Sequence, residues 1–548
     1  MNFFAPLLPR DPILADPSSP LDARLRCGAM SWVEDGFGAP VVVYLFYLLK
    51  VVLYVGGFVL CCAPSTAHHA QLAWAMGPVA FQKAVVWSAV FEVLGLGCGS
   101  GPLTGRYLPP LGGVLHFIRR GTPKRAPWPS LPIVGGDRRG VVDVGVFVAF
   151  VALAAAVLAA PAPSRGLLAA LLGAWVIMSL CDSTLFLAAR SEHYAVLVAC
   201  FILSDEWLMG ARGVALALWT WAGVSKLNAH FPYVVSVMAS NSPLVPRMLR
   251  RRLVRRYPED LRPSGLARAM AHLGAGLELA VPFAFIMART PTQLTVAFGL
   301  MLALHAFIIG SVPLGVPLEW NVMVVYQGFV LFGANRALSW SWPPPLTLAL
   351  LLVACVAVPL AGNLGPAHVS FLPSMRYYAG NWACSAWLFR GESYRKLHAS
   401  LTLPTPWVGD QLARLYPEAV GRAVLAKALA FRAMHLHGRA LVALAPRAAS
   451  DVDTRTWLDG ELVCGMTLGW NFGDGHLHDE RLVASLQRSC GFGPGELRCV
   501  MVESQPLFGD SLAYRIVDAA TGPVERGQLP IVALLERQPW GEPVTPKS

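Results

Sequence analysis

Apolar stretches of about 20 residues limit how this chain can fold more than any other feature, because a helix of that length crosses the hydrocarbon core of a bilayer. "APVVVYLFYLLKVVLYVGGFVLCC", residues 39–62, is a clear example. Of all residues in the chain, 55% are hydrophobic and only 14% are charged. A soluble domain carries more charge than this. The sequence therefore predicts a mainly α-helical protein that crosses the membrane many times.

Ten apolar runs have the length and character of spans. The run at 194–209 is the shortest, and a re-entrant segment is the alternative for it. The expected spans lie at 39–62, 79–97, 141–160, 167–189, 194–209, 211–229, 269–288, 292–312, 318–334 and 344–364.

The formal net charge of +11 is concentrated between these runs, in "RRGTPKR" (119–125) and in 247–260. Cytoplasmic loops of membrane proteins collect Lys and Arg in this way, so the charge indicates topology and argues against nucleic-acid binding. Four spans separate the loops 98–140 and 230–268, which places both loops on one side. We predict a multi-pass protein of the cell membrane with both termini in the cytoplasm. If 194–209 is re-entrant, the C-terminal tail faces outward instead.

The character of the sequence changes at both ends of the helical region. Aromatic and cationic residues in 376–398 favour a segment at the membrane interface. After it, helical patterns at 409–447 and alternating residues with turn signals at 455–540 predict a small soluble α+β domain. The expected organisation is an N-terminal interfacial segment (1–38), a transmembrane domain (39–365), a second interfacial segment (366–400) and a soluble domain (401–548).

Candidate metal ligands are few and weak. The eleven cysteines form no CxxC pair, so they indicate neither a zinc site nor a disulfide framework. "GWNFGDGHLHDERL" (469–482) contains Asp474, His476 and His478, and an H-x-H spacing on a strand would place both imidazoles on one face. The same residues also describe a turn that enters a helix with an acidic cap. We favour the turn and keep the metal site as a weak alternative.

Ionisable residues inside spans are costly, and each one suggests a function. Glu92, Asp182, Glu278 and His305 lie within the expected spans, whereas His193 and Lys226 lie at span ends. Structural hydrogen bonds explain the buried groups equally well, and Lys226 can snorkel to the interface. For Glu92 and Asp182 the structural interpretation is the stronger one.

The neighbours of Lys226 favour a functional interpretation. Trp219, Gly223 and Lys226 follow helical spacing and share one face. Glycine permits close approach of another helix or of a flat ligand. A lysine in apolar surroundings tends to lose its proton and so becomes usable as a general base.

The order of these segments resembles a known family. The segments "SEHYAVLVACFILSD" (191–205), "LWTWAGVSKLNAHFP" (218–232), "GLELAVPF" (276–283) and "LALHAFIIGSVPLGVPLEWNVMVV" (302–325) resemble the horizontally transferred transmembrane (HTTM) domain. This domain is the membrane module of the vitamin K-dependent gamma-carboxylases, and the resemblance covers about 190–330. The whole chain also resembles an actinobacterial family of transmembrane proteins of unassigned function.

The first resemblance implies an enzyme. In the carboxylases, a lysine at the place of Lys226 deprotonates a reduced naphthoquinone, and oxygen and carbon dioxide then take part in the reaction. His193 matches a histidine that helps to stabilise the oxygenated intermediate, and Glu278 and His305 match positions on facing helices. Trp219, Trp221 and Gly223 would then contact the quinone.

The carboxylase region that binds a propeptide is not recognisable, so oxidation of a quinone or lipid without carbon dioxide transfer is equally open. The expected partners are membrane lipids, a lipophilic quinone, and a protein or lipid-linked substrate. The alternative is a non-catalytic transporter or lipid-binding scaffold whose buried charges form a proton or substrate pathway.

Overall fold

The computed structural model describes residues 4–8, 12–63, 72–97, 112–312, 317–335, 341–377, 380–470 and 474–541. Helices dominate up to residue 364, and a unit built on a five-stranded sheet follows them. We call residues 380–470 and 474–541 the C-terminal unit.

The helical part contains these elements: η1 (Pro12–Leu14), α1 (Leu21–Asp35), α2 (Val41–Cys62), η2 (Leu72–Met76), α3 (Pro78–Val93), α4 (Gly112–Phe117), α5 (Val141–Ala159), α6 (Arg165–Cys181), α7 (Ser183–Ala188), α8 (Ser191–Leu203), α9 (Trp207–Ser225), α10 (Phe231–Asn241), α11 (Arg247–Arg252), the short strands β1 (Val254–Arg256) and β2 (Asp260–Pro263), α12 (Gly265–Met287), α13 (Pro291–Ile309), α14 (Leu318–Gly328), the π-helix η4 (Phe329–Ala334), α15 (Pro345–Leu351), the π-helix η5 (Leu352–Ala357) and α16 (Val358–Leu364).

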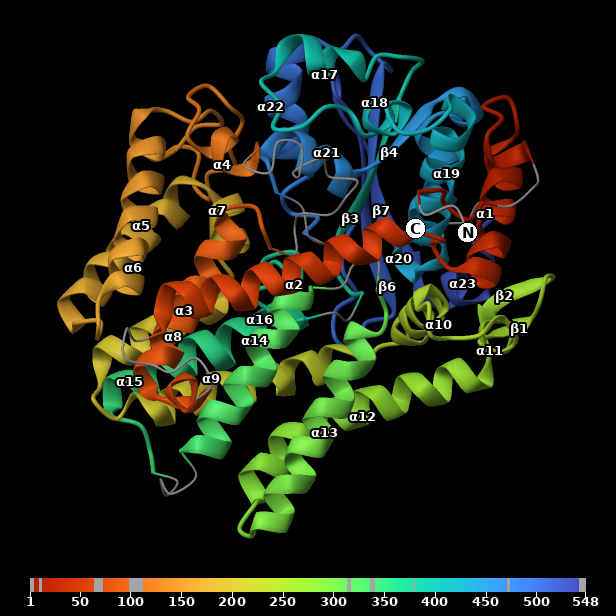
Figure 1. The fold of residues 1–548 in the computed structure, drawn as a ribbon. Helices are drawn as coiled ribbons and strands as arrows, with labels where there is room; N and C mark the ends of the chain where they lie inside the picture. Colours follow the sequence, from red (N-terminus) through yellow and green to blue (C-terminus); the bar gives the residue numbers. More distant parts are fainter. Residues whose placement is uncertain are drawn as a thin grey trace.

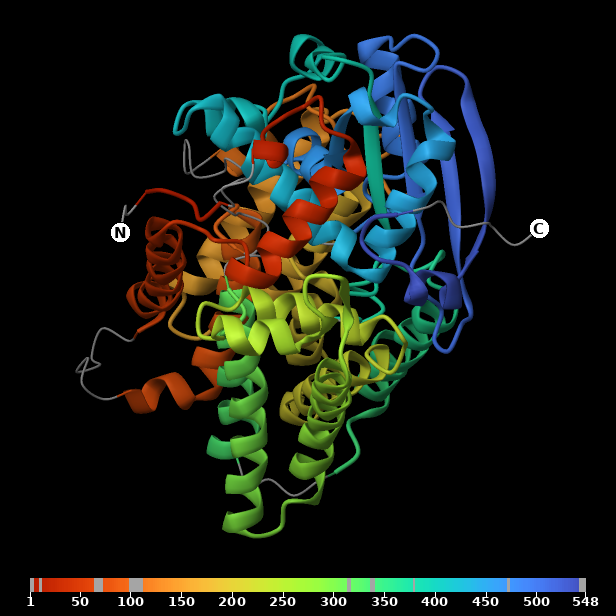
Figure 2. The same ribbon diagram turned by 90° about the vertical axis from the view of Figure 1, so that its right-hand side faces the viewer.

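Five helices among the described residues are long and apolar enough to cross a membrane: α2, α5, α12, α13 and the continuous run from α15 to α16. The α12–α13 hairpin, in green, extends away from the sheet in blue (Figure 2). Its apolar side chains face outward, with Leu273 73% and Phe283 63% exposed. Such a surface is stable when lipid covers it. The structure thus has several helices with the length and apolar surface of membrane spans.

The expected count of ten spans is not confirmed. Each expected run contains a helix. α3, α6 and α8 are shorter than predicted, whereas α14 continues into η4 and so covers 318–334 as expected. α9 has 19 residues, yet it is not among the helices apolar enough to cross a membrane. Polar residues cause some of the shortening. Asp182 follows the last residue of α6 and is the N-cap of α7. Its carboxylate accepts a hydrogen bond from the Thr184 N–H in the first turn of α7. Arg190 then adopts a left-handed conformation ahead of α8.

The C-terminal unit contains β3 (Cys384–Phe389), α17 (Arg395–Ser400), α18 (Val408–Ala413), α19 (Glu418–Met434), α20 (Leu436–Ala448), η6 (Val452–Thr454), β4 (Thr456–Asp459), α21 (Gly460–Leu468), α22 (Glu480–Cys490), β5 (Leu497–Val502), β6 (Ser511–Asp518), β7 (Gly522–Pro530) and α23 (Ile531–Glu536). Its sheet has the order β4-β3-β5-β6-β7, and all neighbours are antiparallel. Helices α19 and α20 lie on one side of the strands, and α21 and α22 lie on the other (Figure 1). Both faces are therefore covered by apolar contacts.

Parts of the two segments expected at the membrane interface belong to this unit or contact it. β3, from the expected segment 366–400, is buried along its whole length and pairs with β4 and β5. α1, from the expected segment 1–38, packs against α19. The contact is close, because a Cβ added at Gly28 would lie 2.7 Å from the Ala430 Cβ. The C-terminal unit therefore includes residues on the N-terminal side of 401.

Both basic loops contact the C-terminal unit. Arg125 bonds Asp479 at 2.7 Å, and Arg262 donates a hydrogen bond to the Glu536 carbonyl at 3.1 Å. The described parts of the loops 98–140 and 230–268 thus lie on the side of the molecule that carries this unit; residues 98–111 are outside the described residues. Which side faces the cytoplasm stays a prediction.

Candidate functional site

Lys226 and Glu278 form a buried ion pair. Lys226 is the C-cap of α9, and Glu278 lies in the middle of α12. The two side chains are only 5% and 6% exposed. Lys226 therefore points into the protein and does not snorkel to the interface. Removing one partner of such a pair typically costs about 3–5 kcal/mol, because it leaves an uncompensated buried charge.

The face of α9 that carries Lys226 packs along α12. Trp219 stacks on Phe285, with ring centroids 5.7 Å apart. A Cβ added at Gly223 would lie 2.7 Å from the Leu279 Cγ, so the glycine permits close helix contact. Gly223 thus meets a helix, and Leu279 occupies the space expected for a flat ligand.

His305 joins this cluster from α13. Trp219 Nε1–H donates to His305 Nε2 at 3.3 Å, and His305 Nδ1 lies 2.8 Å from Asn321 Oδ1. Asn321 Nδ2 donates to the Pro317 carbonyl at 2.7 Å, which fixes the orientation of the amide. Because Oδ1 must then accept, His305 carries its proton on Nδ1 and accepts the indole N–H with Nε2. His305 is held as a neutral imidazole that orients Trp219.

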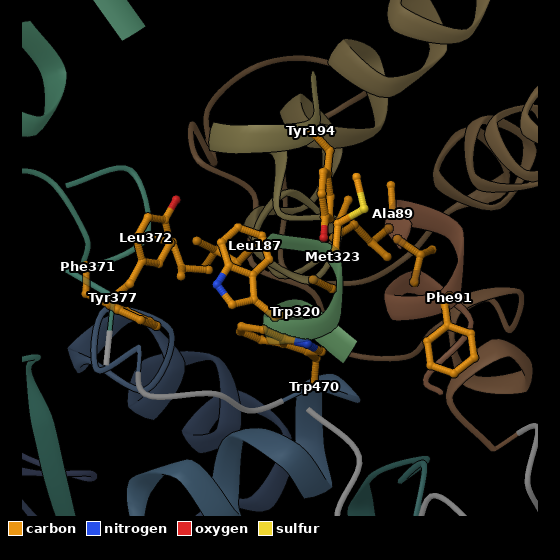
Figure 3. Packing of buried hydrophobic residues seen from close by; sticks show 14 of the residues in the cluster. Ala89, Phe91, Leu187, Tyr194, Trp320, Met323, Phe371, Leu372, Tyr377 and Trp470 are labelled. Atoms are coloured by element: carbon orange, nitrogen blue, oxygen red, sulfur yellow. The ribbon is translucent and has the colours of Figure 1, made fainter. Parts of the chain in front are cut away.

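His193 lies in a neighbouring cluster and does not contact Lys226. Its Nε2 lies 3.0 Å from Gln327 Oε1, and its ring meets Trp320 edge to face at 5.1 Å. Trp320 also contacts Tyr194 and Tyr377 (Figure 3). Helix α14 carries both Asn321, next to His305, and Gln327, next to His193. The two histidines are thus connected through one helix.

Trp221 faces a different side of α9. Its Nε1–H donates to the Cys355 carbonyl at 2.8 Å, and Cys355 belongs to η5. The structure thus brings Lys226, Glu278, Trp219, Gly223 and His305 together, but not Trp221.

Several buried charges near α14 were missed in the sequence. Glu319 bonds Lys50 at 3.1 Å, and both side chains are less than 5% exposed. Glu192, next to His193, accepts a hydrogen bond from the Tyr377 hydroxyl at 3.0 Å. The signal was present, because Lys50 and Glu319 lie within expected spans. Their pairing is not visible in the sequence, because 269 positions separate them.

Glu92 and Asp182 have cationic partners. Asp182 bonds Arg139 at 2.5 Å and also caps α7, and Glu92 lies 4.0 Å from the Arg190 guanidinium. These contacts fit the structural role that we favoured for both residues.

A polar cavity of about 470 Å³ lies between the helical part and the C-terminal unit. Asp474, His476 and Glu503 line it together with residues 367–370, and His476 Nε2 lies 3.1 Å from Glu503 Oε1. Burial alone would lower the pKa of His476, but Glu503 and Asp474 outweigh it and raise this pKa. Conversely, burial alone would raise the pKa of Glu503, and His476 lowers it. Each group thus shifts the pKa of the other in the direction that favours a charged pair at the cavity wall.

The residues of the H-x-H motif separate. His476 faces the cavity, whereas His478 Nδ1 bonds Ser385 Oγ at 2.6 Å inside the C-terminal unit. Burial lowers the pKa of His478 to about 4. Asp479 caps α22 by accepting from the Arg481 N–H. Within the described residues, no three His, Cys, Asp or Glu side chains lie close enough to hold a metal ion. The turn-and-cap interpretation thus accounts for 474–481, and residues 471–473 lie outside the described part.

The fold and the buried polar clusters define a helical membrane protein with a sheet-containing C-terminal unit. The chain belongs to the family described as "Transmembrane protein of unknown function (DUF3556)", whose model matches residues 1–547. This agrees with the resemblance to a family of transmembrane proteins of unassigned function. No curated protein and no solved structure matches the chain. The comparisons thus give no support to the resemblance to the carboxylases.

Proposed function

We propose that this protein is an integral membrane enzyme in which Lys226 and Glu278 transfer protons to and from a lipophilic substrate of the reduced naphthoquinone type. The observation that carries the proposal is the buried Lys226–Glu278 pair, which joins α9 to α12 beside His305. These residues come from three separated segments of the chain. A structural role alone does not require a lysine, a carboxylate and an oriented histidine in one apolar region.

The proton chemistry follows from the pairing. In a region that excludes water, a lysine–glutamate pair exists either as ions or as a neutral amine and acid. From the neutral form, the amine accepts the proton of an acidic hydroxyl, and the ammonium that forms pairs with the quinolate anion left behind while Glu278 stays protonated beside it. Because His305 Nε2 accepts from Trp219, His305 acts in this account as a positioning residue.

The residues around the pair fit a lipophilic quinol in their chemistry. Lys226 Nζ lies 5.7 Å from the centroid of the Phe231 ring, so the amine adjoins an aromatic surface. Lys226 and Glu278 would hold the hydroxyl of the quinol, and Phe231 would adjoin its ring. When bound, a reduced naphthoquinone supplies the reducing equivalents for oxygen. Trp219 and Gly223 are packed against Phe285 and Leu279, so they support the site by holding α9 against α12.

The direct test is oxygen uptake by purified protein in lipid nanodiscs with a reduced naphthoquinone. Lys226→Ala should abolish the uptake that exceeds that of empty nanodiscs. Lys124→Ala is the matched control, because Lys124 is also buried and pairs with Asp143 at 2.5 Å, but lies in the loop before α5. Equal loss in both variants would indicate general destabilisation and would refute the role of Lys226.

The second candidate, a proton or substrate pathway without chemistry, has one observation in its favour. Buried ion pairs recur in the helical part, as in Lys50–Glu319 and Arg139–Asp182, besides the pair at Lys226. Proton flux into liposomes without oxygen uptake would favour this candidate.

A further inference from the structure

The loop between β5 and β6, residues 503–510, contacts the chain segment that follows Lys226. Asn228 donates a hydrogen bond from Nδ2 to the Pro506 carbonyl at 3.3 Å. Its Oδ1 accepts from the Phe508 N–H at 2.8 Å. Asn228 is buried, so the β5–β6 loop supplies partners for both ends of its amide.

A second contact lies next to the first. His230 Nδ1 lies 3.3 Å from Gln505 Oε1, and both side chains are buried. Gln505 is itself fixed, because its backbone exchanges two hydrogen bonds of 2.8 Å with the Asn381 side chain. Its Nε2 also donates to the Gly509 carbonyl at 2.9 Å. The β5–β6 loop therefore presents a braced surface to residues 228–230.

The segment that it contacts has no regular structure of its own. α9 ends at Ser225 and α10 begins at Phe231, so residues 226–230 lie between two helices. Buried polar groups need hydrogen-bond partners, and where secondary structure does not supply them, other parts of the chain must. The C-terminal unit supplies them here.

We infer that the β5–β6 loop positions Lys226, with Asn228 and Gln505 as positioning residues that hold segment 226–230 in place. The C-terminal unit is then an integral part of the membrane-embedded site. The loop begins at Glu503, which pairs with His476 in the polar cavity, so the cavity wall lies two residues from Gln505. The catalytic consequence of this inference rests on the proposed function, but the mechanical contact does not.

Hydrogen–deuterium exchange of the full chain in nanodiscs tests the mechanical part. Asn228→Ala and Gln505→Ala weaken the contact from opposite sides, so one of them remains informative if the other does not fold. Asn241→Ala is the matched control, because Asn241 is buried and its Nδ2 donates to the distant Ser311 carbonyl at 2.8 Å without contacting the loop.

We expect exchange in peptides covering 224–231 and 503–510 to become about tenfold faster in the two loop-contact variants. Asn241→Ala should leave both peptides at the wild-type rate. Unchanged exchange of 224–231 in both contact variants would overturn the inference. Equal acceleration in the control would also overturn it.

Oxygen uptake tests the catalytic part. Asn228→Ala should lower the maximal rate about tenfold while the quinone concentration at half-maximal rate stays unchanged, because positioning acts on the reacting state. A rise in that concentration with an unchanged maximal rate would contradict the positioning role. If exchange accelerates as expected but the wild type consumes no oxygen, the contact stands and only the proposed function fails.

Discussion

Lys226 and Glu278 pair across α9 and α12 although 52 positions separate them in the chain. Each is a charged residue in a largely apolar region, and each neutralises the other. Breaking the pair should therefore lower the stability of the protein. Lys226→Met or Glu278→Leu alone should lower the free energy of unfolding by about 3–5 kcal/mol. The double variant should cost less than the sum of the two, because no uncompensated charge remains.

Denaturant unfolding of the four proteins in detergent measures this cycle. Additive costs would show that the two side chains do not interact in solution.

Gly223 gives a steric prediction. Gly223→Ala places a methyl group 2.7 Å from the Leu279 Cγ, so the helices must separate. Overpacking of this kind typically costs about 1–3 kcal/mol. Leu279→Ala removes the side chain that the new methyl group meets. Gly223→Ala should therefore cost less stability in the Leu279→Ala background than in the wild type. If Gly223→Ala unfolds like the wild type, α9 and α12 are not in close contact at this position.

The hydrogen-bond network of His305 predicts its tautomer. In protein labelled with ¹⁵N-histidine at pH 7.5, the His305 signal should show the proton on Nδ1. Asn321→Leu removes the acceptor, and the Nδ1–H form should then lose its dominance. Solid-state NMR in lipid bilayers makes the measurement, with His305→Gln to assign the signal. A dominant Nε2–H form in the wild type would contradict the network.

The His476–Glu503 pair predicts how stability changes with pH. The pKa of His476 is raised above its ordinary value of 6.5, so its contribution is complete below about pH 6.5 and is lost as the pH rises through the folded-state pKa. The pKa of Glu503 is lowered below 4.5, so its contribution is complete above about pH 4.5 and is lost as the pH falls through the folded-state pKa. The pair thus contributes most between these two values.

His476→Gln should therefore cost more stability at pH 5.5 than at pH 8.5. Mass-resolved thiol labelling reports unfolding of the sheet, because Cys499 is fully buried in β5. A cost that is equal at both pH values would show that the pair carries no net charge interaction. Asp474 and Arg376 also act on the pKa of His476, so both residues stay unchanged in this comparison.

The sequence predicted the helical membrane class and singled out most residues of the buried cluster. Lys226, Glu278 and His305 stood out because ionisable groups are rare in apolar helices. The sequence does not show which helix faces which, so the pairing of Lys226 with Glu278 and the orientation of His305 by Asn321 were not predicted. The face shared by Trp219, Gly223 and Lys226 follows from helical spacing, but the partner of that face does not.

Two other features needed tertiary information. The aromatic and cationic residues of 376–398 predict an interfacial segment, yet "CSAWLF" (384–389) within it is a buried strand. A strand covered on both faces lacks the alternation by which a sequence shows a strand. The break at Asp182 had a local signal, because "CDST" contains an N-cap residue within an apolar run. Hydrophobicity alone extended the expected span across this break to residue 189.

The most direct test of the account is the initial rate of oxygen uptake in nanodiscs supplied with a reduced naphthoquinone. The wild type and Lys124→Ala should consume oxygen at similar rates above empty nanodiscs. Lys226→Ala should be slower by a factor of about 100 or more, the usual effect of removing a general base. No uptake by the folded wild type, even when cell extract supplies substrates, or undiminished uptake by Lys226→Ala, would contradict the proposal that Lys226 is the base of a membrane enzyme.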